Sequence, residues 1–254
     1  MKLKKIILCI LAFSILICAC GCSATESIEL NGVTYNKCSR GEVKCMTILA
    51  VGYNYVESNM VYIPDEANGR VVTDVGTKPI YGNSIAKIYG VEKVYFPWSI
   101  KYSPVGNIEY TLEVKYIISA STVTLIDTHH QPIFVIPRGM YNEPERDYAI
   151  RGVHTTINLT EESNILPANI AYFFNYEQNP NEGYFFVDLL EESGKITKPP
   201  YDPKREGYTF LGWYKEPECV NAWDFENDVV EIQYDEDGNR IYEEICLYAK
   251  WVEQ

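Results

Sequence analysis

Residues of the kinds that bind metal ions are most concentrated in one short stretch of this 254-residue sequence, Asp235-Glu236-Asp237-Gly238-Asn239. Alternating carboxylates ahead of a glycine are typical of calcium-binding loops of the EF-hand type. In such loops the glycine follows three alternating oxygen ligands, whereas here it is already the fourth residue. Tyr234 and Ile241 flank the stretch, and we therefore expect a hairpin turn with solvated charges.

Neither the histidines nor any common enzyme motif indicates a catalytic site. His129-His130 lies between Asp127 and Pro132, but no third metal ligand stands at a useful spacing. The sequence contains no Gly-x-Ser-x-Gly elbow, phosphate loop, dinucleotide fingerprint or His-Glu-x-x-His pair. Carboxylates are many, yet we expect none to stand in an apolar strand that would tune its pKa. We therefore predict that the protein is not an enzyme and that it holds no metal and no cofactor.

The charge balance excludes two classes of partner. The chain has 22 Lys and Arg against 35 Asp and Glu, which gives a net charge of −13. Nucleic-acid binding needs clustered basic residues that neutralise phosphates, and anionic lipid headgroups repel an acidic chain. Hydrophobic residues make up 46% of the sequence, which is enough for the cores of one large or two ordinary domains.

The N-terminus has the parts of a secretory signal. Lys2, Lys4 and Lys5 precede an apolar run over 6–18, which is too short to cross a bilayer as a mature helix. The run ends in Ile17-Cys18-Ala19-Cys20, with an aliphatic residue three positions before Cys20 and a small residue one position before it. This arrangement resembles the lipobox of bacterial lipoproteins.

The lipobox resemblance implies a lipoprotein signal peptide over residues 1–19 and a lipidated tether over 20–27. Acyl chains such as palmitate on Cys20 would hold the mature protein on the extracytoplasmic face of the cell membrane. Cys22 is the rival attachment residue, with a less usual residue at the third position before it. An ordinary cleaved signal with incidental cysteines is the alternative.

Four cysteines remain as disulfide candidates once those at 9, 18, 20 and 22 are set aside, and export permits them to form disulfides. Cys38 and Cys45 bracket a turn that contains a glycine, and Cys219 and Cys246 lie together in the last segment. Local pairs 38–45 and 219–246 are the simplest pairing. A four-thiolate zinc site is the alternative, but the sequence lacks the Cys-x-x-Cys spacing of such sites.

Residues 28–150 are predicted to be rich in β-strands. Asn31-Gly32 between two short β-favouring runs predicts a tight hairpin. Apolar triplets closed by proline then recur in Val61-Tyr62-Ile63-Pro64, Val94-Tyr95-Phe96-Pro97 and Phe134-Val135-Ile136-Pro137, with a degenerate copy at 114–118. Strands that recur with loops between them are the pattern of a solenoid.

The segment 68–76, which follows Ile63-Pro64, resembles the BspA-type leucine-rich repeats of bacterial surface proteins. It reads Asn-Gly-Arg-Val-Val-Thr-Asp-Val-Gly, but the usual Ala-Phe pair and regular leucines are missing around 79–88. An irregular β-sandwich with coincidental prolines is the alternative. We expect one helical turn at 144–149 and a polar connector over residues 151–169.

Residues 170–254 carry the strongest pattern in the sequence. Two aromatic strands at 172–176 and 184–190 precede the motifs Arg205-Glu206-Gly207-Tyr208-Thr209-Phe210-Leu211-Gly212-Trp213-Tyr214, Trp223-Asp224-Phe225 and Leu247-Tyr248-Ala249-Lys250-Trp251. In this order the motifs resemble the internalin B-repeat (Listeria–Bacteroides repeat) family. The resemblance implies a small β-grasp-like module.

A module of about 80 residues buries only about 60% of its unfolded surface, so large aromatic side chains must fill most of its core. The residues that we expect in that core are Tyr208, Phe210, Trp213, Trp223, Phe225 and Trp251. The alternative is that these aromatic residues form a sugar-binding face.

The predicted fold class is mainly β, with an irregular leucine-rich-repeat-like β region followed by the β-grasp-like module. Members of both families are tied to adhesion and protein–protein contact. The resemblance therefore implies a non-catalytic, adhesin-like binding role at the cell surface, with an unidentified protein or glycan as ligand. A passive structural spacer and a glycan-binding accessory protein are the alternatives.

Overall fold

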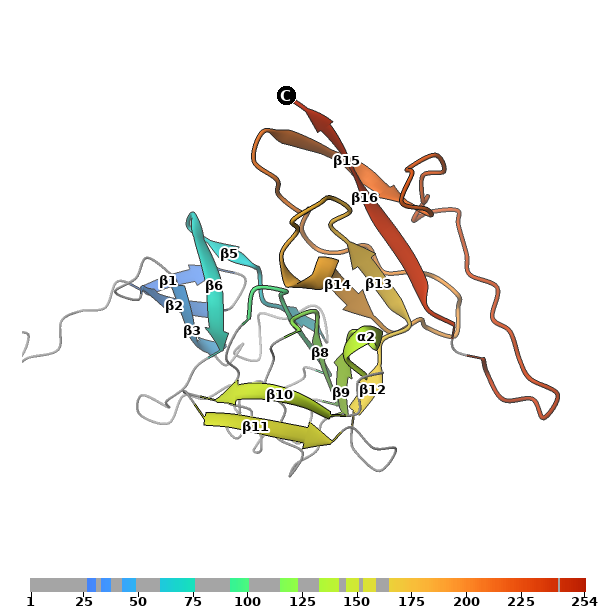
Figure 1. Ribbon diagram of the computed structural model, residues 1–254, viewed down its shortest axis with the longest axis horizontal. Coiled ribbons are helices and arrows are strands. Elements are labelled where there is room, and N and C mark those ends of the chain that lie inside the picture. The colour runs from blue at the N-terminus through green and yellow to red at the C-terminus, as the bar shows by residue number, and fades with distance from the viewer. Residues whose placement is uncertain are drawn as a thin grey trace, which may run out of the picture.

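The computed structural model describes residues 27–30, 33–37, 43–48, 60–75, 92–100, 115–122, 133–141, 145–150, 153–158, 165–241 and 243–254. These residues form four β-sheets and only short helical segments, so the predicted mainly-β fold class is confirmed (Figure 1). Within this part of the chain, no helix is both long enough and apolar enough to cross a membrane.

The N-terminal sheet has five strands in the order β1-β2-β3-β6-β5. Its members are β1 (Ser27–Leu30), β2 (Val33–Lys37), β3 (Val43–Ile48), β5 (Glu66–Ala67) and β6 (Arg70–Val75). β1 and β2 pair antiparallel, with Leu30 opposite Val33. The two strands on either side of Asn31-Gly32 therefore form the expected hairpin, because a two-residue connection brings them back side by side.

The second sheet is parallel throughout, and its strands follow one another in chain order. They are β4 (Met60–Tyr62), β7 (Lys93–Phe96), β8 (Tyr116–Ser119), β9 (Ile133–Ile136) and β12 (Ile165–Pro167). The proline-closed triplets lie in register, and one buried residue from each strand forms a row across the sheet. That row is Val61, Val94, Ile117, Phe134 and Ile165.

A parallel sheet built in chain order is what a solenoid with one strand per turn requires, because each unit must pack on its neighbour. The structure thus has the stacking that the repeated triplets predicted. The connecting segments 76–91, 101–114 and 123–132 lie outside the described residues, so the assignment to leucine-rich repeats stays a prediction.

A separate hairpin follows the short helix α2 (Arg138–Tyr141). Its strands β10 (Glu145–Ile150) and β11 (Val153–Asn158) pair antiparallel along their whole length. The expected helical turn at 144–149 is wrong, because pairing with β11 gives this segment a ladder of hydrogen bonds that a single helical turn lacks. The expected connector over 151–169 likewise contains strands β11 and β12.

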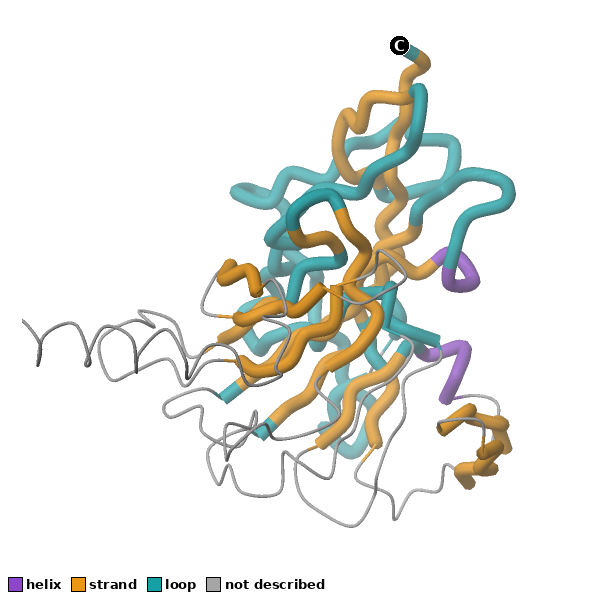
Figure 2. Tube along the Cα trace, turned by 90° about the vertical axis from the view of Figure 1, so that its left-hand side faces the viewer, coloured by secondary structure: helices purple, strands orange, loops and turns teal. Residues whose placement is uncertain are grey.

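The C-terminal module is a four-stranded sheet in the order β14-β13-β16-β15. Its strands are β13 (Ile170–Phe173), β14 (Tyr184–Asp188), β15 (Tyr208–Tyr214) and β16 (Ile245–Glu253), and the 3₁₀ turn η3 (Asn181–Gly183) precedes β14. The two central strands, β13 and β16, are parallel, and both edge strands are antiparallel to them. This order, second–first–fourth–third, is that of a β-grasp sheet. Figure 2 shows the module turned by 90°, with the C-terminus at the top.

The parallel sheet and the module share one hydrophobic core. A single cluster of buried side chains includes Tyr95 and Ile118 from the parallel sheet and Tyr172 and Phe186 from the module. Strand β14 is buried at all five positions and contacts both β8 and β9. The module therefore packs against the parallel sheet and is not a structurally separate domain.

Candidate functional site

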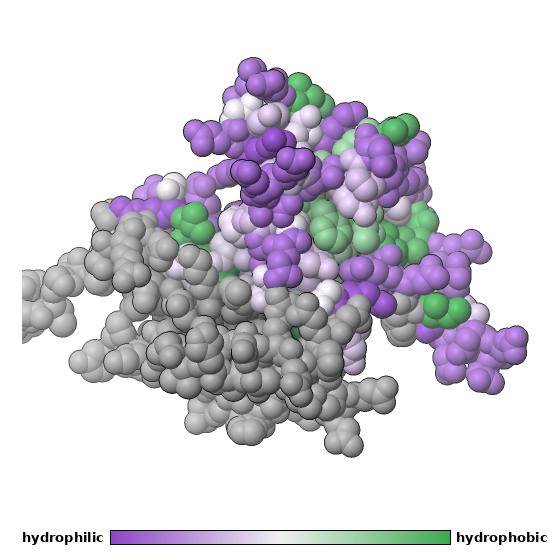
Figure 3. All heavy atoms as spheres, in the orientation of Figure 1, coloured by the Kyte–Doolittle hydropathy of each residue, from purple (hydrophilic) through white to green (hydrophobic). Residues whose placement is uncertain are grey.

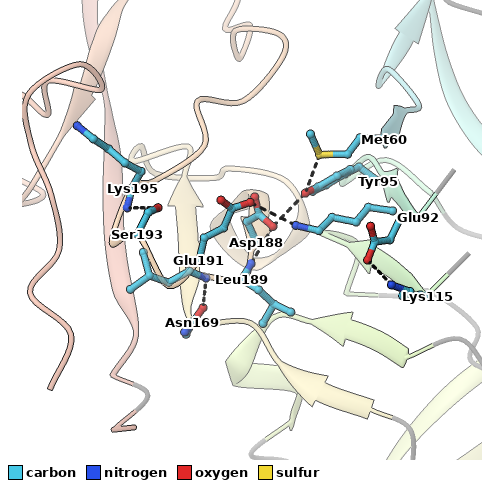
Figure 4. Close-up of polar contacts among 12 residues, drawn as sticks. Met60, Glu92, Tyr95, Lys115, Asn169, Asp188, Leu189, Glu191, Ser193 and Lys195 are labelled. Atoms are coloured by element: carbon cyan, nitrogen blue, oxygen red, sulfur yellow. Dashed lines mark hydrogen bonds and ion pairs between the residues drawn. The ribbon is translucent and has the colours of Figure 1, made fainter. Parts of the chain in front are cut away.

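The most unusual polar group in the described residues lies where the parallel sheet meets the module. Asp188, at the end of β14, is 1% exposed. The Tyr95 hydroxyl from β7 donates a hydrogen bond to its Oδ1 over 3.1 Å, and the Leu189 backbone N–H donates to the same atom over 2.8 Å (Figure 4). A carboxyl group thus links two sheets across a buried junction.

Aromatic rings surround this link. The Tyr62 and Tyr95 rings stack with centroids 4.4 Å apart, and Tyr95 stacks in turn on Phe186 at 5.4 Å. These three rings come from β4, β7 and β14, and the stack therefore joins the parallel sheet to the module. Stacked rings remove water from the Asp188 carboxyl, and this desolvation disfavours its charged form.

Burial is the main reason that the pKa of Asp188 rises to about 6. The Leu189 N–H, the Lys93 ammonium and the Tyr95 hydroxyl act in the opposite direction, while Glu191 raises the pKa further. The expectation that no carboxylate stands in an apolar strand was therefore wrong, since Asp188 closes a strand that reads Tyr-Phe-Phe-Val-Asp. Chemically, this group can take up a proton close to neutral pH.

The phenols beside Asp188 are shifted as well. Burial, followed by the nearby Asp188 charge, raises the pKa of Tyr62 to about 12 and raises that of Tyr95. Both phenols are therefore neutral donors at physiological pH. The Lys93 Nζ atom lies 3.6 Å from a Glu191 carboxylate oxygen, so its charge is shared with an acid other than Asp188.

Two further groups of polar contacts join the module to the rest of the protein. Asn181 Oδ1 accepts hydrogen bonds from the Thr122 N–H and hydroxyl at 2.8 and 2.9 Å, and Asn181 Nδ2 donates to Ala120 O at 2.7 Å. On another side, the Lys204 Nζ atom of the module forms an ion pair at 3.0 Å with Glu66 Oε2 of β5, which belongs to the N-terminal sheet. The junction is thus fixed at several separate points around an apolar centre.

The six aromatic residues that the sequence motifs placed in the module core have different environments. Trp213 is 2% exposed and belongs to the buried cluster. Four others are partly buried and pack against that cluster: Phe210, Trp223, Phe225 and Trp251. Tyr208 is outside it, beneath the Arg205 guanidinium at 3.6 Å. Within the module, the largest fully buried rings come instead from the strands β13 and β14 and the residue after β13: Tyr172, Phe174, Phe185 and Phe186.

Cations of the module cover ring faces near its surface. Arg205 lies between the rings of Tyr208 and Tyr176, at 3.6 and 4.5 Å from their centroids. Lys250 Nζ lies 4.6 Å from the Tyr214 ring centroid. A sugar that stacks on an aromatic residue needs an open ring face, and these contacts occupy one face of each ring. The ring faces that Arg205 and Lys250 cover are therefore closed to a stacking sugar.

Removal of the Arg205 side chain is expected to have a modest, measurable effect on stability. Arg205→Ala deletes both cation–π contacts, and we expect a loss of about 1–2 kcal/mol in the free energy of unfolding. Urea denaturation measures this change. Lys204→Ala, which removes the neighbouring surface ion pair, is the matched control and should cost less than about 1 kcal/mol. Equal effects of the two substitutions would contradict the role assigned to Arg205.

The structure does not form the expected 219–246 disulfide. Cys219 and Cys246 are both free thiols, and Cys219 Sγ lies 3.7 Å from Ala249 O. Cys246 is three residues away along β16, roughly 10 Å at the rise of a strand, which is too far for a disulfide. Burial raises the pKa of both thiols, which makes them poor nucleophiles at neutral pH.

The remaining cysteine predictions concern segments that the structure does not describe in full. Cys38 lies outside the described residues and Cys45 falls in β3, so the 38–45 pair stays a prediction. Cys20 and Cys22, the candidates for lipid attachment, also lie outside the described residues, as does His129-His130.

The acidic stretch 235–239 forms the hairpin turn that we expected. Tyr234 and Arg240 form an antiparallel bridge, and the Asp235 N–H donates to Asn239 O over 2.8 Å. The Asp235 carboxylate accepts hydrogen bonds from the backbone N–H groups of Asp237 and Asn239. This carboxylate therefore stabilises the turn itself. Figure 3 shows the hydrophilic residues of this arm at the lower right edge of the molecule.

Comparison with known families supports the sequence-based assignment of the module. Residues 172–250 match the Listeria–Bacteroides repeat domain. The match covers β14 and β15, the second half of β13 and most of β16. The prediction of this repeat is thus confirmed for the C-terminal third of the chain.

Two relatives from Evansella cellulosilytica are similar to part of the chain. One, named as a predicted membrane protein, is 30% identical over 120 residues, which cover 42% of this chain and 16% of that protein. The other, named as a predicted Gly-rich membrane protein, is 28% identical over 120 residues, covering 42% of this chain and 13% of that protein. The chain therefore spans only a small part of the length of each relative.

Proposed function

We propose that this is a surface-associated bacterial protein that is held at the membrane and binds other proteins. The match of residues 172–250 to the Listeria–Bacteroides repeat domain carries this proposal. The names of the two relatives are consistent with membrane association. We further propose that the attachment is an acyl anchor on Cys20, or else Cys22, and that it holds the chain on the extracytoplasmic face.

The parallel sheet supports the finer proposal that residues 28–150 are a degenerate leucine-rich-repeat region. Its strands β4, β7, β8 and β9 lie in this range and stack in chain order and in register, with the row from Val61 to Phe134 buried. Such stacking creates an extended surface from repeated units, which is a form that solenoid proteins use to bind partners.

A binding role fits the described residues better than the two alternatives. A passive spacer needs no rigid relation between its parts, whereas here one core joins the parallel sheet to the module. A glycan-binding protein needs open aromatic faces, and Arg205 and Lys250 cover one ring face each of Tyr176, Tyr208 and Tyr214. We therefore propose a non-catalytic, adhesin-like protein that holds no cofactor.

The proposal is tested by binding of the non-lipidated fragment 23–254 to an array of extracellular proteins and, in parallel, to polysaccharide resins. We expect saturable binding to at least one protein and none to the polysaccharides. The same fragment unfolded in urea and diluted onto the array is the control for non-specific adhesion. Binding to polysaccharide alone would support the glycan-binding alternative, and a folded fragment that binds neither would support the spacer.

A further inference from the structure

Burial of the Asp188 carboxyl group in the junction costs free energy. This residue is 1% exposed and lies against the ring stack that unites the parallel sheet with the module. Its partners are two hydrogen-bond donors, Tyr95 and Leu189, which do not neutralise a full negative charge. We propose that Asp188 is a proton-operated latch, which fastens the module to the parallel sheet when it is protonated and weakens this junction when it is ionised.

The groups that face Asp188 leave its charge only partly compensated. On β7 these are Tyr95 and Lys93, on β4 Tyr62, on β13 Tyr172, and in the loop after β14 Glu191. Lys93 is the cation among them, and it forms an ion pair with Glu191 at 3.6 Å. The Tyr172 hydroxyl donates to Thr197 O, so it gives no hydrogen bond to the carboxylate.

Protonation removes the buried charge without breaking the observed contacts. With the proton on Oδ2, Oδ1 still accepts from the Tyr95 hydroxyl and the Leu189 N–H. The acid form is therefore compatible with the same junction geometry. The difference between the two states is the cost of burying the charge.

The sign of the effect follows from proton linkage. The pKa of Asp188 is raised from 3.8 to about 6 in the folded protein, so the folded state binds the proton more tightly than the unfolded state does. The contribution of Asp188 to stability is therefore fully present below pH 3.8 and is lost as the pH rises through about 6. A shift of this size changes the ratio of folded to unfolded protein by up to about 160-fold.

The experiment uses the full chain in detergent, with ¹³C-labelled aspartate. NMR follows the carboxyl titration of Asp188, assigned with Asp188→Asn, and urea denaturation gives stability from pH 7.5 to pH 4.5. We expect a titration midpoint near 6 and a stability that increases as the pH falls through this range. Asp188→Asn should be more stable than the wild type at pH 7.5 and should lose this component of the pH dependence.

Two further variants make the test specific. Asp235→Asn removes a carboxylate of an exposed turn far along the chain, and the titration of Asp188 should be unchanged in it. Tyr95→Phe removes a donor that lowers the pKa of Asp188, so the midpoint should move upward. A wild-type midpoint near 4, a Tyr95→Phe midpoint that stays or falls, or unchanged pH dependence in a folded Asp188→Asn protein would each overturn the latch. None of these results depends on whether a binding partner is found.

Discussion

Phe186→Ala is expected to destabilise the parallel sheet and the module together, by about 3–5 kcal/mol. The Phe186 ring is 2% exposed and stacks on Tyr95 at 5.4 Å. It also contacts the Tyr172 ring edge to face at 5.7 Å. Removal of this ring leaves a cavity between two sheets that cannot close independently, because several other contacts fix their separation.

The measurement is urea unfolding followed by circular dichroism, combined with native-state hydrogen exchange. Exchange should accelerate in β8 of the parallel sheet as well as in β13 of the module, since both pack on the shared core. Leu211→Ala, at a side chain that is 53% exposed, is the control and should change stability by less than about 0.5 kcal/mol. Faster exchange in the module alone would show that the two parts unfold independently.

The strands themselves were largely predictable because their signals are local. The proline-closed triplets fall in β4, β7 and β9, or directly after them, since proline cannot continue a ladder of backbone hydrogen bonds. The Gly-Tyr-x-Phe-x-Gly-Trp-Tyr and Leu-Tyr-Ala-x-Trp motifs likewise became β15 and β16. Patterns of alternating residues and turn residues are sufficient to place such elements.

Burial was less predictable because it depends on which sheets pack together. The motif residues Tyr208 and Phe210 lie toward one end of edge strand β15 and remain partly exposed. Phe185 and Phe186 lie in β14, where the module meets the parallel sheet, and are fully buried. A repeat signature describes the module alone, and it contains no information about the neighbouring sheet that makes β14 the centre of the core.

Asp188 was missed for the same reason. An aspartate at the end of an apolar strand is usually interpreted as the start of a solvated turn. Asp188 is instead buried where Tyr95, 93 residues away in the sequence, packs against it. A signal was nevertheless present in the sequence, because Leu189-Leu190 continues the apolar run past the carboxylate. A charge with apolar residues on both sides is a candidate for a buried, functional group.

The 219–246 pair was predicted from nearness in sequence, which says little about distance across a sheet. Cys219 lies in the loop after β15, beside Ala249, while Cys246 lies near the beginning of β16. Because Tyr214 pairs antiparallel with Tyr248, the loop after β15 begins beside this part of β16 and not beside Cys246. A strand register therefore decides whether two cysteines can meet.

Cys20→Ser is expected to release the protein from the membrane, which would be the largest change in its behaviour from a single substitution. The lipobox-like sequence Ile17-Cys18-Ala19-Cys20 makes Cys20 the proposed attachment residue. Each buried CH₂ of an acyl chain contributes about 0.8 kcal/mol to membrane binding, so several chains give stable attachment. Without the thiol no chain can be attached, and the net charge of −13 would not hold the protein at an anionic surface.

Detergent-phase partitioning of the full chain expressed in bacteria measures this change, and mass spectrometry of the N-terminal peptide identifies the acylated residue. Cys22→Ser is the matched control, because it removes a neighbouring thiol with the same chemistry, and it should leave partitioning unchanged. Release by Cys22→Ser alone would place the acyl chains on Cys22 instead. If the double variant still partitions with the membrane, the acyl anchor is wrong and another segment of the chain must hold the protein there.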